Sequence, residues 1–220
     1  MKANTKPYNL PTHRRLHEPS LQFGSLDEET AGPHPLAGLL EHGPFSKNRL
    51  AGVPNPIRIA FIGQKNMFGR LHGLIRELEG RHQPKERRKY LLDYPGFSRI
   101  FETALAYAGD NVSIELPESI DDDFKASATP HLMLSEILTG AVASLRNQRH
   151  AFDIVFIGLD EKWAAGFERS GDEDFDLHDY LKGYSASAGI PLQIIRGGSP
   201  NRANYARKLV TVISGGVFDL

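Results

Sequence analysis

Three polar residues near the end of the sequence have the types and spacing to meet at one ligand: His178, Lys182 and Gln193. On a helix, His178 and Lys182 are one turn apart, so both side chains project from the same face. Gln193 interrupts an apolar run, and a buried amide without partners is costly, so we expect it to make a specific hydrogen bond. The alternative is that His178 and Lys182 are exposed helix positions and that Gln193 caps local backbone.

Other motifs carry less information about chemistry. No Walker loop, GxSxG or HExxH motif is present. The segment Gly63–Gly69 only loosely imitates a phosphate-binding turn, because no Lys-Ser or Lys-Thr follows its last glycine. The acids of Asp172–Asp179 lack the spacing of a calcium loop, so we interpret them as a solvated helix start. We interpret Asp121–Asp123 as a loop ahead of the next helix.

Length and composition are typical of one globular core with extensions. The chain has 220 residues, of which 40% are hydrophobic, and it contains no cysteine. Disulfides and thiolate metal sites are therefore excluded. The apolar runs are far shorter than a bilayer span and the N-terminus is polar, so we expect a soluble, cytoplasmic protein without membrane contact.

Charge is unevenly distributed along a chain of formal net charge -1. Residues 81–90 hold five Lys or Arg against one Glu, whereas residues 160–179 hold eight acids against two basic residues. Phosphate binding needs clustered basic groups, and a local basic surface can exist on a neutral protein. The alternative for residues 81–90 is a solvated loop.

The hydrophobic pattern predicts the elements that must position these residues. Residues 1–55 show no sustained period and are predicted to be an extended N-terminal arm. Strands are predicted at 57–63, 112–116, 152–159 and 190–196, and helices at 67–81, 97–107, 132–148, 176–188 and, with a strand as the alternative, 204–213. Apolar strands alternating with helices predict an α/β fold: a Rossmann-like, doubly wound parallel sheet covered on both faces. Its ligand site is expected in the loops after Gly63, Leu159 and Arg196.

At these residues the sequence resembles the MID domain of Argonautes. That family places a Tyr, His or Arg, then a Lys four residues later, then a Gln, and finally a Lys on a following helix. The segment HDYLKGYSASAGIPLQIIR supplies His178, Lys182 and Gln193 in this order, and Lys208, with Arg207 as substitute, would be the fourth ligand. The match is one residue out of step after Asn204.

Further segments extend the resemblance over most of residues 18–220. The segments EPSLQFG and PLAGLLEHGPF resemble the family's stretch before the MID domain, FDIVFIGLDEKW resembles its strand ending near a Trp, and the end of the chain resembles its first PIWI strand. The resemblance implies an arm at 1–55, a MID domain at 56–197 and the start of a PIWI-like region at 198–220. We expect either a fragment or a second chain that completes the protein.

The resemblance also implies a role for each candidate residue. Lys182 and Lys208 would contact the 5′-phosphate of a guide strand, Gln193 would donate to a phosphate, and His178 would stack on the first base. The guide is expected to be RNA rather than DNA, with Mg²⁺ bridging its phosphates left open as a cofactor. No carboxylate tetrad for cleavage is present, so we expect this chain not to be an enzyme.

Short prokaryotic Argonautes, which the sequence resembles, act with partners in defence against invading nucleic acid. The implied partners are a complementary target strand of single-stranded DNA and an effector protein of the TIR, sirtuin-like or nuclease type, or a separate PIWI chain. Two other functions stay open: an interaction module of a defence complex with a vestigial pocket, and a small nucleotide-binding α/β enzyme that uses Gly63–Gly69.

Overall fold

The computed structural model describes residues 20–24, 30–44, 54–84, 92–169 and 174–197. The chain divides into two compact units, residues 1–47 and residues 48–220, and each is described by itself.

The first unit contains regular elements in its described parts. Strands β1 (Leu21–Gln22) and β2 (Ala31–Gly32) pair antiparallel, and helix α1 (Pro35–His42) follows them. Phe23 is buried, and its ring lies so close to Gly38 that a Cβ there would be 2.0 Å from Cε2. The sequence pattern of the predicted arm gave no sign of these elements.

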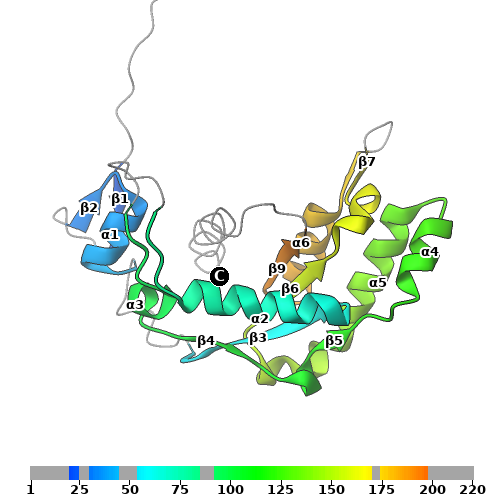
Figure 1. Ribbon diagram of the computed structural model, residues 1–220, viewed down its shortest axis with the longest axis horizontal. Coiled ribbons are helices and arrows are strands. Elements are labelled where there is room, and N and C mark those ends of the chain that lie inside the picture. Colours follow the sequence, from blue (N-terminus) through cyan, green and yellow to red (C-terminus); the bar gives the residue numbers. More distant parts are fainter. Residues whose placement is uncertain (1–19, 25–29, 45–53, 85–91, 170–173, 198–220) are drawn as a thin grey trace, which may run out of the picture. The chain divides into compact units, whose positions relative to one another are not determined.

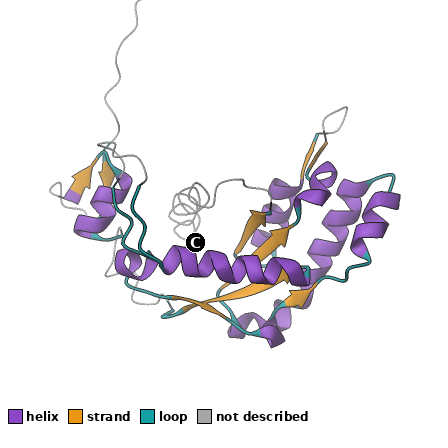
Figure 2. Ribbon diagram, in the orientation of Figure 1, coloured by secondary structure: helices purple, strands orange, loops and turns teal. Residues whose placement is uncertain are grey.

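The second unit is built on a parallel sheet (Figures 1 and 2). Its strands lie in the order β4-β3-β6-β9, and β5 also pairs with β3. All of these pairings are parallel. The strands are β3 (Ile57–Gly63), β4 (Leu105–Tyr107), β5 (Ile114–Glu115), β6 (Ile154–Leu159) and β9 (Leu192–Arg196). The central strands are almost wholly buried, which explains their continuous apolar runs.

Helices follow the strands along the chain. They are α2 (Lys65–Glu79), α3 (Phe97–Phe101), α4 (Ile120–Ala126), α5 (Pro130–Ser144) and α6 (Leu177–Ser187), with short 3-10 helices at Asp110–Val112, Arg146–Ala151 and Glu161–Gly166. Before α6, β7 (Glu168–Arg169) and β8 (Phe175–Asp176) form a short antiparallel pair. No helix in the described segments has both the length and the hydropathy needed to cross a bilayer.

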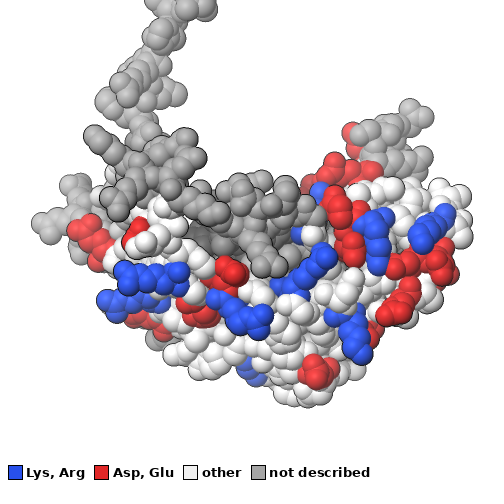
Figure 3. Space-filling view, in the orientation of Figure 1, with Lys and Arg blue, Asp and Glu red and all other residues white. Residues whose placement is uncertain are grey.

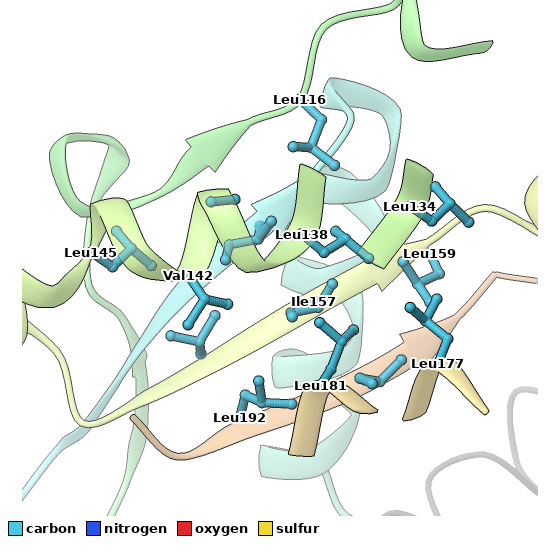
Figure 4. Packing of buried hydrophobic residues seen from close by; sticks show 14 of the residues in the cluster. Leu116, Leu134, Leu138, Val142, Leu145, Ile157, Leu159, Leu177, Leu181 and Leu192 are labelled. Atoms are coloured by element: carbon cyan, nitrogen blue, oxygen red, sulfur yellow. The ribbon is translucent and has the colours of Figure 1, made fainter. Parts of the chain in front are cut away.

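The sheet has a hydrophobic core on each face. Figure 4 shows how residues of α5 and α6 pack over Ile157 on one face: Leu134, Leu138 and Val142 of α5, Leu145 directly after it, and Leu177 and Leu181 of α6. On the other face, α2 and α3 pack against alternate residues of the same strands. The predicted α/β fold with a parallel sheet flanked by helices is therefore confirmed, and it is compatible with a Rossmann-like fold.

One predicted helix is partly wrong. The segment 97–107 was expected to be helical throughout, but α3 ends at Phe101 and residues Leu105–Tyr107 form strand β4. Glu102 has φ 56°, a left-handed conformation that ends the helix. Pairing of β4 with the first residues of β3 then determines the conformation of the following segment, which local periodicity cannot predict.

The expectation for Asp121–Asp123 is also wrong. These residues lie in the first turn of α4 and not in a loop. Carboxylates in this position interact favourably with the helix dipole. The predicted helix at 204–213 lies outside the described residues.

Candidate functional site

Helix α6 begins with a capping interaction that fixes the first candidate residue. Asp176 is the N-cap, and its Oδ1 accepts hydrogen bonds from the backbone N of His178 at 2.7 Å and of Asp179 at 3.2 Å. Buried Leu177 and Leu181 anchor the helix on the sheet. His178 therefore sits in the first turn.

Lys182, one turn after His178, is half-buried. Its Nζ donates to the carbonyl oxygen of Leu192 at 2.6 Å, which joins α6 to β9. Burial lowers the pKa of Lys182 below its ordinary value. The carbonyl partner is neutral, so the bond orients the ammonium without neutralising it. The alternative that Lys182 is simply an exposed helix position does not hold.

Gln193 on β9 is buried, with 8% of its surface exposed. Its Nε2 donates to the carbonyl oxygen of Ile194 at 3.2 Å, so the expected hydrogen bond exists and goes to local backbone. By strand alternation its side chain leaves the sheet on the same face as Ile195, which packs with α2, whereas α6 packs on the opposite face. The structure thus places His178 and Lys182 one turn apart on one helix, whereas the side chain of Gln193 leaves β9 on the opposite face of the sheet.

Two of the candidate residues, Lys182 and Gln193, make their hydrogen bonds at the outer edge of β9. Val155 N donates to Pro191 O, and Gly197 N donates to Leu159 O, so odd-numbered residues of this segment turn their backbone groups towards β6. The carbonyls of Leu192 and Ile194 therefore face away from β6. Lys182 and Gln193 donate to these two outward carbonyls.

His178 has a partially exposed side chain, at 44%. Its Nδ1 lies 3.0 Å from Asp179 Oδ1. Ligand atoms of Asp176, His178 and Asp179 all lie within 4.8 Å of one another, so these three groups can supply ligands to a cation. Two of the three are nonetheless already engaged, because Asp176 caps the helix and Asp179 contacts the imidazole.

The remaining predicted ligands, Arg207 and Lys208, lie outside the described residues, as does the basic segment 85–91. On the described surface visible in Figure 3, Lys and Arg side chains alternate with Asp and Glu. A phosphate site on this face would therefore depend on a few local groups and not on a broad basic field.

A second polar cluster, which the sequence analysis missed, centres on Asp121. Its Oδ1 accepts from Gln64 Nε2 at 3.1 Å and from Trp163 Nε1 at 3.0 Å, while its Oδ2 pairs with Lys162. Partial burial alone would raise the pKa of Asp121, but the bonds from Lys162, Trp163 and Gln64 outweigh it and lower the pKa. Gln64 follows β3, and Lys162 and Trp163 follow β6, which are two of the three places where a ligand site was predicted, whereas Asp121 belongs to the first turn of α4.

The sequence contained one usable sign of this cluster. Gln64 and Asp160 directly follow the two most apolar strands, where polar residues of a parallel sheet commonly bind ligands. Asp121 carried no such sign, because its contacts join segments more than 40 residues apart along the chain.

No protein-family model matches this chain, and no curated protein matches its sequence.

Proposed function

We propose that this chain binds the 5′-phosphorylated end of a guide nucleic acid, as the MID domain of an Argonaute does. The observation that carries the proposal is the half-buried ammonium of Lys182, held one helical turn from His178 and bonded to a neutral carbonyl.

A buried cation without a counter-charge is unfavourable, and a bound anion would relieve this cost. The bond to Leu192 uses one of the three N–H donors of Lys182. The other donors can contact phosphate oxygens, and a charge-assisted bond of this kind is stronger than one between neutral groups. Lys182 is therefore the proposed phosphate ligand among the described residues.

His178 and Gln193 supply the other contacts in this proposal. The partially exposed imidazole of His178 offers a flat surface on which the first base stacks, a mode that tolerates many bases. Gln193 would exchange its bond to the backbone of β9 for one to a phosphate oxygen. Arg207 or Lys208 would add a further positive charge.

The fold supports the assignment of His178. A Rossmann-like sheet binds ligands beyond the carboxyl ends of its strands, and α6 runs back along the sheet so that its first turn, with His178, lies near that edge. Lys182 lies one turn further and contacts Leu192, the first residue of β9. By the resemblance, the guide is RNA in preference to DNA and directs recognition of a single-stranded DNA target. The chain would act by binding, with an effector protein or a PIWI chain as partner, in prokaryotic defence.

The test compares a short RNA that carries a 5′-phosphate with the same RNA that carries a 5′-hydroxyl, at one fixed salt concentration. Wild-type protein should prefer the phosphorylated RNA. Lys182→Met should lose roughly 1.5–3 kcal/mol of binding free energy for that RNA, as expected for a hydrogen bond to a charged group. Lys125→Met is the matched control, because Lys125 lies on α4 with 75% of its side chain exposed.

Equal affinity for the two RNAs in the folded wild-type protein would contradict the proposal. So would an equal loss in Lys182→Met and Lys125→Met, because that result indicates general attraction to polyanions and no dedicated phosphate site.

A further inference from the structure

A pocket of about 160 Å³ lies at the carboxyl edge of the sheet, beyond the ends of β3 and β6. It is lined by Gln64, Lys65, Asn66, Glu118, Asp121 and Lys162. The sheet places β4 and β5 on one side of β3 and places β6 and β9 on the other, so the direction in which successive strands are added to the sheet reverses between β3 and β6. In open α/β sheets this crevice is where ligands bind.

Gln64 gives the most specific sign of a ligand. The residue is 3% exposed, and its Oε1 is buried without a hydrogen-bond partner. The orientation of the amide is fixed, because Nε2 donates to Asp121 Oδ1 at 3.1 Å and a carboxylate can only accept. Buried carbonyl oxygens in native proteins are nearly always satisfied. Gln64 lines the pocket, so its fixed and buried Oε1 is an acceptor at this site for which the described residues supply no O–H or N–H donor.

The same pocket contains features that favour an anion. Gln64 is the N-cap of α2 but makes no side-chain capping bond, and the first turn of this 15-residue helix contains no acid. The N-terminal N–H groups and the helix dipole therefore favour a negative group there. The exposed ammonium of Lys65 adds positive charge, whereas the ammonium of Lys162 is already paired with Asp121 and lies 3.7 Å from Asp160 Oδ2.

The segment after β5 contributes two acidic residues, Glu118 and Asp121, to the pocket lining. Asp121 accepts from Lys162, Trp163 and Gln64, so its charge is already compensated. Glu118 is exposed and can accept from a hydroxyl group. The lining thus combines the ammonium of Lys65 and helix N–H donors with acceptors that suit hydroxyl groups.

We propose that this pocket binds a small phosphorylated sugar, with the phosphate at the N-terminus of α2 and a sugar hydroxyl donating to Gln64 Oε1. A cavity of about 150 Å³ holds a benzene-sized ring. The pocket therefore accommodates one sugar ring, whether the ligand is a free sugar phosphate or the sugar phosphate part of a nucleotide. This assignment does not rest on guide binding at α6.

The experiment is a titration of isotopically labelled full-length chain with ribose 5-phosphate, ribose and inorganic phosphate at fixed ionic strength, followed by NMR. Ribose 5-phosphate should shift the backbone amides of Lys65 and Asn66 and the side-chain amide of Gln64. It should bind at least about tenfold more tightly than ribose or phosphate, since each of these can make only part of the contacts.

Two variants with matched controls test the residues involved. Gln64→Met should lose the advantage of ribose 5-phosphate over inorganic phosphate, whereas Gln148→Met should keep it. Gln148 also has a buried Oε1 without a partner, but it lies before β6, at the opposite edge of the sheet. If Gln64→Met does not fold, Lys65→Gln at an exposed position should weaken ribose 5-phosphate binding, with Lys125→Gln as its control.

Three outcomes would overturn the proposal. The first is no shift at Lys65 and Asn66 at millimolar ribose 5-phosphate, which means that water alone satisfies Gln64. The second is equal affinity for inorganic phosphate, which means that the sugar makes no contact. The third is shifts confined to α6, which place the ligand at the guide site and not in this pocket. Adding nucleoside monophosphates to the series then distinguishes a nucleotide from a simple sugar phosphate as the ligand.

Discussion

The ammonium nitrogen of Lys182 on α6 lies 2.6 Å from the carbonyl oxygen of Leu192 on β9. This bond sets the position of the one lysine of the proposed phosphate site that belongs to the described residues. It also places a cation in a partly desolvated environment, with consequences for stability as well as for binding.

We expect Lys182→Met to reveal how the desolvation of this ammonium affects stability. Burial lowers the pKa of Lys182, so the unfolded chain holds the proton at pH values where the folded protein has begun to lose it. The stability of the wild type relative to the variant should therefore rise as the pH increases towards 10.5, the ordinary lysine value. Urea unfolding of both proteins at pH 7 and at pH 10 measures this. A constant difference across the range would show that Lys182 is solvated.

The ion pair of Arg58 on β3 with Asp153 should stabilise the sheet in a pH-dependent way. Arg58 Nε and Nη2 donate to the two oxygens of Asp153, each at 3.0 Å, and Arg58 N donates at 2.7 Å. Partial burial would raise the pKa of Asp153, but the bonds from Arg58 lower it overall. The stabilisation is therefore present above the ordinary value of 3.8 and is lost as the pH falls through the lower folded-state pKa.

Asp153→Asn should accordingly lower the thermal midpoint at pH 7, and the difference from wild type should shrink as the pH falls below 3.8. Asp122→Asn is the control, because Asp122 is 90% exposed and should leave the midpoint almost unchanged. A difference that does not change with pH would mean that the substitution acts through packing.

Asp121→Ala should destabilise the protein by leaving a buried donor unpaired. Trp163 is 1% exposed, and its indole N–H donates to Asp121. An unsatisfied buried donor costs about 1–3 kcal/mol. Chemical unfolding followed by the fluorescence of this single tryptophan gives the free energy directly. Asp122→Ala on the same helix turn serves as the comparison, and an equal loss in both variants would assign the effect to the helix start.

Gly166→Ala should strain the core, whereas Gly140→Ala should not. A Cβ at Gly166 would lie 2.7 Å from Leu134 Cδ1, 2.9 Å from Phe124 Cε2 and 3.1 Å from Pro130 O. Overpacking of this kind costs roughly 1–3 kcal/mol. At Gly140, in α5, a Cβ meets nothing within 4 Å, so the gain in helix propensity of up to about 1 kcal/mol should appear instead. Unfolding midpoints of the two variants, measured side by side, should move in opposite directions.

Strands buried on both faces could be predicted from the sequence, because burial on both faces requires a continuous apolar run. The strand at 57–63 has the predicted bounds, and β6 and β9 begin two residues later than predicted. Helix α6 was predicted well because its signals are local: Asp176 caps its start, and Gly189, with φ +66°, follows its end. Strand β4 was missed because only its pairing with β3 makes Leu105–Tyr107 extended.

In the candidate site, too, local features could be predicted from the sequence and features that depend on the tertiary fold could not. The one-turn spacing of His178 and Lys182 follows directly from helix geometry, so the sequence could place them together. Gln193 bonds to a carbonyl at the free edge of β9. This edge is free within the described sheet only because β9 is its last strand, and the sequence does not state the strand order. The Asp121 cluster depends on three segments meeting at one end of the sheet, namely those that follow β3, β5 and β6, and no local pattern encodes such a meeting.

The outward carbonyls of β9 also bear on self-association. Within the described segments β9 pairs only with β6, and a strand edge of this kind is a template on which another polypeptide can add and begin aggregation. Lys182 and Gln193 already occupy the acceptors at Leu192 and Ile194. An incoming strand would have to displace both side chains and bury a charged ammonium beside its own backbone, so these residues protect the sheet from edge-to-edge growth.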